Sequence, residues 1–472
     1  MQVTPTDQDL HVIARFGAVA IALICVQLDY FALALALPSM AAELDVSSTE
    51  LQWSISGYMI AIGIAMVPGS RLADLIGRKR VLLLGLSIFG LASLWVGLSP
   101  TAESVIAARV LQGLGAGIYF PVAMSLVTNA TNPVERPRIL GMLTGIAGVG
   151  TALGPIIGGG LSDTIGWRWV FFVNVPVALI GVVWGHFQLD ESKDPELKLL
   201  KIRNLDWLGV VLIAVGVTGV SLGIDDIATA GFWSPITIVP LILGIVALVV
   251  FVRWEHRSKW PLIPPKLWKN NKFSALVVAA SIANAGLVVM IFVATLYLQE
   301  VQEFSGLVAG LMFIPAAIGL SVGGPLSGRM ASRIPGQRVM TVAMLAGAVT
   351  LVVLAVTSNT VIYLIVMGFS SFFLGLGFQF GNIAVQSVVK ESEAGTGAGV
   401  ILTIMVTLGG LAVVAAAASI NIVGDGFPTQ AASTVTLLTW AGVVGVLGLI
   451  FGLSQWRKAE LHAPTDQGSE AA

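Results

Sequence analysis

The chain consists of long apolar runs that are interrupted by charges, prolines or polar clusters. A run of about 18 or more apolar residues can cross roughly 30 Å of hydrocarbon as an α-helix. The runs are too continuous for the alternating segments of about 10 residues that build an outer-membrane barrel. The pattern predicts about 14 membrane-spanning helices, at residues 12–37, 51–70, 81–99, 103–127, 138–161, 168–187, 206–224, 234–254, 274–298, 307–328, 338–357, 360–385, 396–421 and 433–454.

Composition agrees with this interpretation. The 472 residues are 56% hydrophobic and only 11% charged, and the mean hydropathy is +0.90. Soluble domains carry about 25% charged residues, so most of this surface must face something other than water. We therefore predict an all-α protein of the lipid bilayer. The first apolar run lacks a cleavage site and is long enough to be a retained helix rather than a signal peptide.

Other composition features exclude several classes of function. A net charge of −1 gives no indication of a nucleic-acid partner. Cys25 is the one cysteine, which excludes a disulfide or a cysteine metal site within one chain. The histidines show no metal-ligand spacing, and no phosphate-binding G-x-x-x-x-G-K-[ST] loop is present, so ATP is not expected to drive the protein. We expect no enzyme activity, no metal and no cofactor.

Lysine and arginine predict the orientation in the membrane. Of 25 such residues, Arg109 lies deep within a span and Arg168 lies at an odd-numbered loop, which leaves 23 on the inner side, in or next to the even-numbered loops and the tails. Loops rich in lysine and arginine stay in the cytoplasm. The bias predicts an even number of spans with both termini in the cytoplasm.

Two long polar breaks divide the chain. They read "LDESKDPELKLLKIRN" and "RWEHRSKWPLIPPKLWKNNK", and they enclose two spans with few buried polar groups. Duplicated six-helix halves are a common plan among transporters. We predict two six-helix bundles with two extra central helices, divided as residues 1–190, 191–270 and 271–456, followed by a cytoplasmic tail at 457–472.

Two charges lie within the apolar spans of the first half. Asp29 interrupts "LICVQLDYFALALALP" about nine residues, or ~13 Å, from the outer end of its helix. Arg109 lies at a comparable depth in "RVLQGLGAG", where an unpaired arginine costs ~2.5–3.5 kcal/mol on insertion scales. The two can pair, which would lower the cost of both. The alternatives are that Arg109 extends to the interface, or that the pair is purely structural.

Two further motifs stand at the second loop and the fifth span. In "SRLADLIGRKR", positive loop topology explains the cations, but not Asp74 at a helix C-terminus, where the dipole disfavours a negative charge unless an arginine or another helix compensates it. In "GVGTALGPIIGGGL", glycines recur every four residues, so one helix face allows close approach of another helix. Pro155 removes a backbone donor there and favours a bend. Ordinary tight packing is the alternative explanation.

Together these motifs resemble the major facilitator superfamily, specifically its 14-helix branch of drug:proton antiporters. The resemblance covers nearly the whole chain, although Ser70 and Leu75 replace the usual glycine and arginine of the second-loop motif. It implies a cytoplasmic gate motif at Asp74, Gly77, Arg78 and Lys79, proton coupling at Asp29 and Arg109, and an antiporter motif at Gly150, Gly154, Pro155, Gly158 and Gly159.

The amides of the spans are candidates for lining a cavity, or for bonding neighbouring helices. They are Gln112, Asn284, Gln379, Asn382 and Gln386. The loop "GPLSGRMASRIPGQR" is a degenerate echo of the second-loop motif, with Gly328 at the position that corresponds to Asp74. The stretch "WRWVFFVNVPV", with Arg168, is interpreted as an interfacial aromatic belt.

The resemblance implies a proton-coupled antiporter in a bacterial cytoplasmic membrane. It would act as a monomer, driven by the proton gradient, and would export hydrophobic or cationic drugs. An exporter of an endogenous lipid or secondary metabolite would share every motif. A proton symporter should lack the Gly154–Pro155 motif, and a non-transporting sensor would carry a signalling domain.

Overall fold

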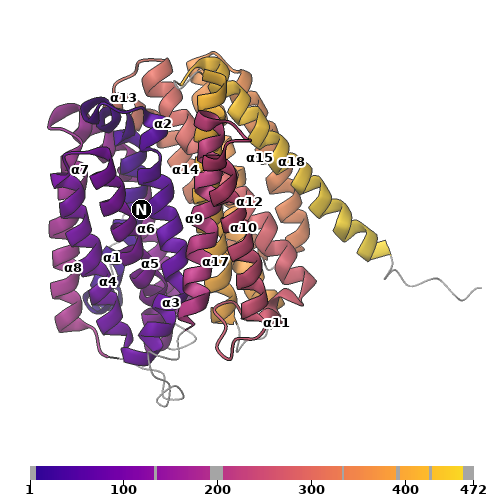
Figure 1. The fold of residues 1–472 in the computed structure, drawn as a ribbon. Coiled ribbons are helices and arrows are strands. Elements are labelled where there is room, and N and C mark those ends of the chain that lie inside the picture. Colours follow the sequence, from indigo (N-terminus) through magenta and orange to yellow (C-terminus); the bar gives the residue numbers. More distant parts are fainter. Residues whose placement is uncertain are drawn as a thin grey trace, which may run out of the picture.

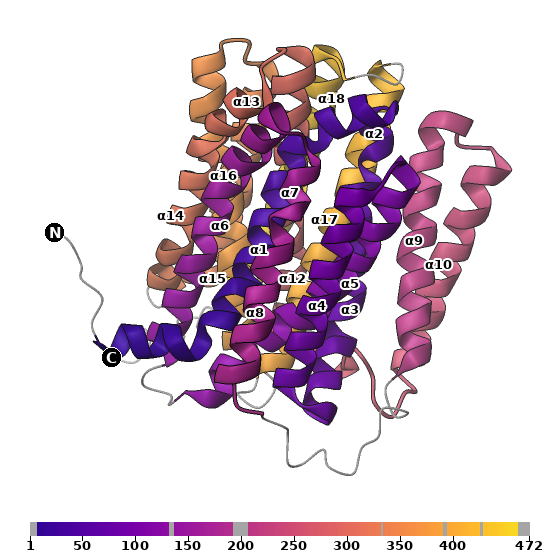
Figure 2. The ribbon, with the colours of Figure 1, turned by 90° about the vertical axis from the view of Figure 1, so that its left-hand side faces the viewer.

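The computed structural model describes residues 7–131, 136–191, 206–331, 334–389, 394–424 and 428–460, and side chains within most of that part of the chain. Every regular element in those ranges is a helix (Figures 1 and 2). Thirteen helical segments there are long and apolar enough to cross a membrane. A further helix of 29 residues, α6, occupies the predicted fifth span. The predicted all-α membrane fold with 13 to 14 spans is thereby confirmed.

The N-terminal half supplies the first six spans. Its helices are α1 (Asp7–Leu44), α2 (Ser48–Leu51), α3 (Trp53–Ile76), α4 (Arg78–Leu98), α5 (Ala102–Ala130), α6 (Arg136–Thr164), α7 (Arg168–Phe172) and α8 (Asn174–Gln188). The short α7 and α8 together form the sixth span. The sixth span is interrupted between α7 and α8 because Pro176 has no N–H to donate to the preceding turn. Proline is tolerated at this position because it lies in the first turn of α8.

The C-terminal half repeats this plan. Its helices are α12 (Asn271–Leu296), the π-helix η3 (Tyr297–Val301), α13 (Gly306–Met312), α14 (Ile314–Ala331), α15 (Gly336–Val356), α16 (Thr360–Val388), α17 (Ala394–Gly424) and α18 (Gln430–Glu460). A proline, Pro315, again lies in the first turn after the break between α13 and α14. The α12 helix is buried along almost its whole length, as the centre of this half.

The two extra spans form a hairpin outside both halves. They are α9 (Trp207–Ala230) and α10 (Pro235–Glu255), and the short α11 (Pro265–Trp268) follows them. The hairpin stands at one side of the molecule, next to α3 and α17 (Figure 2). Trp53 Nε1 donates to Asp225 Oδ2 at 2.8 Å and so links α9 to α3. Most large side chains of α10 are exposed, as expected for a helix that faces lipid.

Candidate functional site

Asp29 and Arg109 form an ion pair inside the N-terminal half. The Arg109 Nη1 atom donates to Asp29 Oδ2 at 2.6 Å, and both side chains are completely buried. The hypothesis that the two charges pair is supported by this contact. Because Arg109 is fully enclosed, its guanidinium does not extend to the membrane interface. Opposite charges at this distance offset much of the cost of desolvating each other, provided that their remaining hydrogen-bonding atoms are satisfied.

The second oxygen of Asp29 is held by two amides. Gln112 Nε2 and Asn174 Nδ2 each donate to Asp29 Oδ1 at 2.9 Å. Gln112 Nε2 also donates to Ser93 Oγ at 2.7 Å, so the network joins α1, α4, α5 and α8. An ionised carboxylate accepts hydrogen bonds and donates none, so three N–H donors around one carboxylate suit its charged form. Protonation of Asp29 would remove the negative charge of its ion pair with Arg109.

Arg109 is positioned by further contacts from α3. Its Nε donates to the backbone oxygen of Ser54 at 2.9 Å, and its Nη1 donates to Gln112 Oε1 at 2.6 Å. Its Cζ lies 3.9 Å from the ring centroid of Tyr58, a cation–π arrangement. The Nη2 atom is buried and has no partner among the described residues. The Nη2 group of Arg109 is therefore available to donate a hydrogen bond, whereas its Nε and Nη1 groups already have acceptors.

The glycine motif of α6 packs against the helix that carries Asp29. A Cβ atom at Gly150 would lie 3.1 Å from the backbone oxygen of Ile24, and one at Gly154 would lie 2.6 Å from the Cβ of Phe31. A Cβ at Gly158 would collide with the backbone of Ala32. These contacts fall on both sides of Asp29 along α1. The motif thus sets how close α6 lies to α1.

The opposite side of α6 contacts the C-terminal half. Gly159 approaches the backbone of Gly306, and the backbone oxygen of Pro155 approaches Gly310. Asp163, at the end of α6, accepts hydrogen bonds from the backbone N–H groups of Gly306 at 3.0 Å and Leu307 at 2.6 Å. Helix α6 therefore joins the Asp29-bearing helix to the other half.

Two more polar contacts join the halves at the same end of the molecule. Glu300 of η3 accepts a hydrogen bond from the Ser48 hydroxyl. The neighbouring Gln299 donates from Nε2 to the backbone oxygen of Leu35 at 3.0 Å. Together with Asp163, they hold the halves together at the end opposite to Asp74. Short π-helical turns such as η3 often occur at functional sites of helical proteins.

The second-loop motif forms a compact turn at the other end. Asp74 Oδ1 and Arg78 Nη2 are 2.7 Å apart, so an arginine compensates the charge at the α3 C-terminus. Gly77 has φ +118°, which favours glycine, and a Cβ there would strike the Glu191 carboxylate. Glu191 accepts a hydrogen bond from the backbone N–H of Lys79 at 3.2 Å. Lys79 Nζ donates to the His186 backbone oxygen at 2.7 Å, which ties α4 to the end of α8.

Most of the predicted cavity amides bond to helix backbones instead. Asn284 Nδ2 donates to the Met405 oxygen at 2.9 Å, and Gln379 Nε2 donates to the Leu320 oxygen at 2.8 Å. Asn382 donates to Phe378 of its own helix at 3.3 Å. Of the two alternatives, bonding of neighbouring helices is thus the one seen for the amide nitrogens of Asn284 and Gln379. The side chain of Gln386 lies outside the described residues.

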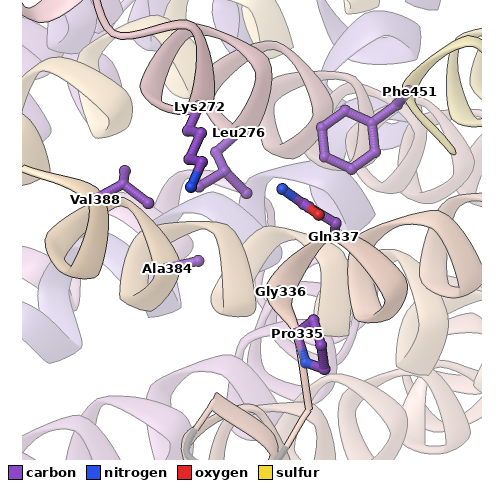
Figure 3. A pocket seen from close by; sticks show the side chains of 8 residues that line it. All are labelled: Lys272, Leu276, Pro335, Gly336, Gln337, Ala384, Val388 and Phe451. Carbon is purple, nitrogen blue, oxygen red and sulfur yellow. The ribbon is translucent and has the colours of Figure 1, made fainter. Parts of the chain in front are cut away.

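Two cavities in the described part of the chain are relevant to a binding site. One, of about 190 Å³, lies within the C-terminal half between α12, α15, α16 and α18, where Lys272 and Gln337 point into it (Figure 3). The other, of about 10 Å³, lies between the two halves. Its walls come from α1, α6, α12, α14 and α16, and from Phe313 between α13 and α14. The lining residues are Phe31, Pro155, Leu287, Ile291, Phe313, Ala316, Ala317, Leu320 and Ser371.

Sequence reasoning missed three parts of this arrangement. Asn174 lies in the stretch interpreted as an interfacial belt, yet its amide reaches Asp29. Ser93 in α4 and Asp163 in α6 were not singled out either. A polar residue within an apolar span is the signal that could have identified Asn174 and Ser93. Asp163 gave no such signal, because an acid at a helix end is ordinary in sequence.

Comparison with known proteins identifies the family. A profile of the Major Facilitator Superfamily matches residues 19–414. The chain belongs to this superfamily. It is 32% identical to the puromycin resistance protein of Streptomyces alboniger over 325 residues, which cover 68% of this chain and 63% of that protein. It is 30% identical to the tetracenomycin C resistance and export protein of Streptomyces glaucescens, over 71% of this chain and 61% of that protein.

A further relative and two solved structures are also similar to the chain. The multidrug resistance protein Stp of Mycobacterium tuberculosis is 28% identical over 81% of this chain and 71% of its own. The first curated relatives are matched over 63%, 66% and 52% of their own lengths, so the chain spans about half to two thirds of them. The peptide transporter POT superposes with a TM-score of 0.66 at 16% identity, covering 94% of this chain and 95% of POT. A mutant of the nucleoside transporter NupG gives 0.63 at 15% identity, covering 92% of this chain and 98% of its own.

Proposed function

We propose that this superfamily transporter is a proton-coupled antiporter that exports hydrophobic compounds, drugs among them, across a bacterial cytoplasmic membrane. The observation that carries the proposal is the enclosed Asp29–Arg109 network. When the carboxylate held by Arg109, Gln112 and Asn174 takes a proton, it loses the negative charge that pairs with Arg109. Proton uptake would then weaken the contact between α1 and α5.

The packing of α6 supports a route from this proton to the contacts between the two halves. Helix α1 contacts α6 through the glycine face, and α6 contacts α13 through Gly159 and Asp163. A shift of α1 would therefore act on the contacts that hold the two halves together. In this proposal, Asp74 and Arg78 stabilise the cytoplasmic end through their ion pair. The Gly154–Pro155 motif favours exchange over symport.

The names of the relatives support export as the direction of transport and drugs as the transported compounds. They are resistance proteins, and one is named as an export protein. A second candidate cargo is a lipid or secondary metabolite made by the cell itself, because such an exporter would share every motif named above. Both candidates share one mechanism and differ only in substrate.

Purified protein in proteoliposomes tests the mechanism. The vesicles enclose a pH-sensitive dye, and candidate compounds are added with and without an imposed pH gradient. We expect a substrate to move protons across the membrane, and its accumulation to collapse when a protonophore is added. Accumulation that survives the protonophore, or that requires ATP, would contradict the proposal.

A further inference from the structure

Acidic groups are scarce in the interior of the membrane helices. Among the residues that the structure describes, Asp29 is the one Asp or Glu far from the ends of its helix, and the others lie near helix ends or between helices. Both oxygens of Asp29 are occupied by Arg109, Gln112 and Asn174, and the side chain is completely buried. No free carboxylate of the described chain is thus available at mid-membrane depth to balance a positive charge.

The small cavity between the halves has an apolar wall. Phe31, Leu287, Ile291 and Phe313 surround it, with Pro155 of the glycine motif. At about 10 Å³ it is close to the smallest volume that can hold a water molecule, so a larger compound can enter only when the two halves move apart. It lies where the two halves meet, which is where transporters of this architecture place their substrates.

One polar group opens into this cavity. Ser371 of α16 lines it, and its side chain is 1% exposed. The Ser371 hydroxyl has no hydrogen-bond partner in the described part of the chain. A buried hydroxyl without a partner is costly, and most such groups in proteins are satisfied. The hydroxyl can donate to a ligand that carries an acceptor.

We propose that this cavity, when opened, binds uncharged compounds with aromatic or aliphatic rings, and that Ser371 donates a hydrogen bond to an acceptor oxygen on them. This inference rests on the proposed transport function and narrows its substrate class. A permanent cation would enter an apolar space without a counter-ion and lose its hydration, which is strongly unfavourable. Two phenylalanines, Phe31 and Phe313, offer ring contacts to an uncharged compound instead.

Two probes of similar shape and different charge test whether the charge of a compound decides its binding. Triphenylphosphine oxide is neutral and carries an acceptor oxygen, whereas tetraphenylphosphonium is a permanent cation. Binding is measured by isothermal calorimetry on the detergent-purified full chain. Proton release on mixing is read in weakly buffered solution with a pH-sensitive dye. We expect the neutral probe to bind at least ten-fold more tightly than the cation and to release protons. Tighter binding of the cation would overturn the inference.

Three variants of Ser371 test its role. Ser371→Ala should weaken binding of triphenylphosphine oxide about five-fold, the value of one ordinary hydrogen bond. It should leave triphenylmethane, which has no acceptor, unchanged. Ser371→Asp should gain binding of tetraphenylphosphonium, and Ser371→Asn is the matched neutral control. Equal effects of Ser371→Ala on both neutral probes would contradict the hydrogen bond.

The failure of this inference can be told apart from failure of the transport proposal. If tetraphenylphosphonium binds more tightly than the oxide and is exchanged for protons, the antiport mechanism stands and the substrate class is wrong. If protons fail to move with any compound, including the cation, antiport itself is wrong. The wild-type comparison needs no variant, so the inference stays testable even if Ser371→Asp does not fold.

Discussion

At the scale of single residues, the main finding is that a charge pair is completed by neutral amides. Asp29 receives one hydrogen bond from Arg109, one from Gln112 and one from Asn174, and all four side chains are at most 1% exposed. Apart from Arg109 Nη2, the hydrogen-bonding atoms of the pair have partners, which offsets much of the penalty of burying the two charges. Because one carboxylate accepts hydrogen bonds from α5 and α8, loss of its charge would weaken contacts to both helices at once.

Asp29→Asn distinguishes a coupling role from a structural one. The amide keeps the shape and removes the titration, and an amide is cheaper to bury than a carboxylate. If Asp29 carries the proton, the variant should reach the membrane in normal amounts, lose pH-driven transport and keep downhill substrate exchange. Membrane levels and both transport modes are measured in parallel.

The structural alternative makes a different prediction for the same variant. Loss of the carboxylate would leave Arg109 as an unpaired buried cation, which typically costs ~3–5 kcal/mol, so expression and thermal stability should fall. Arg109→Gln combined with Asp29→Asn restores neutrality and serves as the matched control. Wild-type pH-driven transport by Asp29→Asn would show that the proton is held elsewhere.

At the scale of elements, α6 is the helix that relates the two halves. Its glycines allow one side to contact α1 and the other to contact α13. A side chain at Gly158 would meet backbone atoms of Ala32, which cannot rotate away. Backbone contacts of this kind need small residues and are sensitive to any added volume.

Gly158→Leu should therefore damage the protein more than Gly160→Leu, two residues further on. At Gly160 a Cβ would meet only the Cδ1 atom of Leu307, at 3.3 Å, and a flexible side chain can move. We expect Gly158→Leu to lower stability by ~1–3 kcal/mol or more, because overpacking displaces the helix. Melting temperatures in one detergent check this. A similar loss for both variants would remove the special role of the α1–α6 contact.

At the scale of the whole molecule, the buried ion pair belongs to one half, whereas buried hydroxyls occur in both. Among the described residues, the N-terminal half contains the ion pair, and each half contains buried hydroxyls without partners. Those of the C-terminal half include Ser281, Ser370, Ser371, Thr403 and Thr407. The position of the ion pair fits a proton site in one half and a neutral substrate surface that is shared with the other. The polar contacts through Asp163, Gln299 and Glu300 close one end of the interface.

The orientation of the whole molecule is testable by cysteine labelling. Cys25 is buried and is replaced by alanine, and single cysteines are introduced as Arg80→Cys and Thr229→Cys. Arg80 is 68% exposed in the second loop, and Thr229 is exposed at the far end of α9. The distribution of lysine and arginine predicts that an impermeant thiol reagent labels only Thr229→Cys in intact cells. External labelling of Arg80→Cys would reverse the topology.

The sequence alone determined the spans, because membrane insertion depends on continuous apolar length, a local property. It also identified Asp29, Arg109 and the α6 glycines, since a charge or a glycine stripe is conspicuous in an oily helix. Only the tertiary structure decided which partners complete the site. Asn174 bonds to Asp29 across 145 residues of sequence, and a side chain's partner depends on how helices cross. The same reason applies to Ser371, whose hydroxyl is notable only because packing leaves it unpaired beside an apolar cavity.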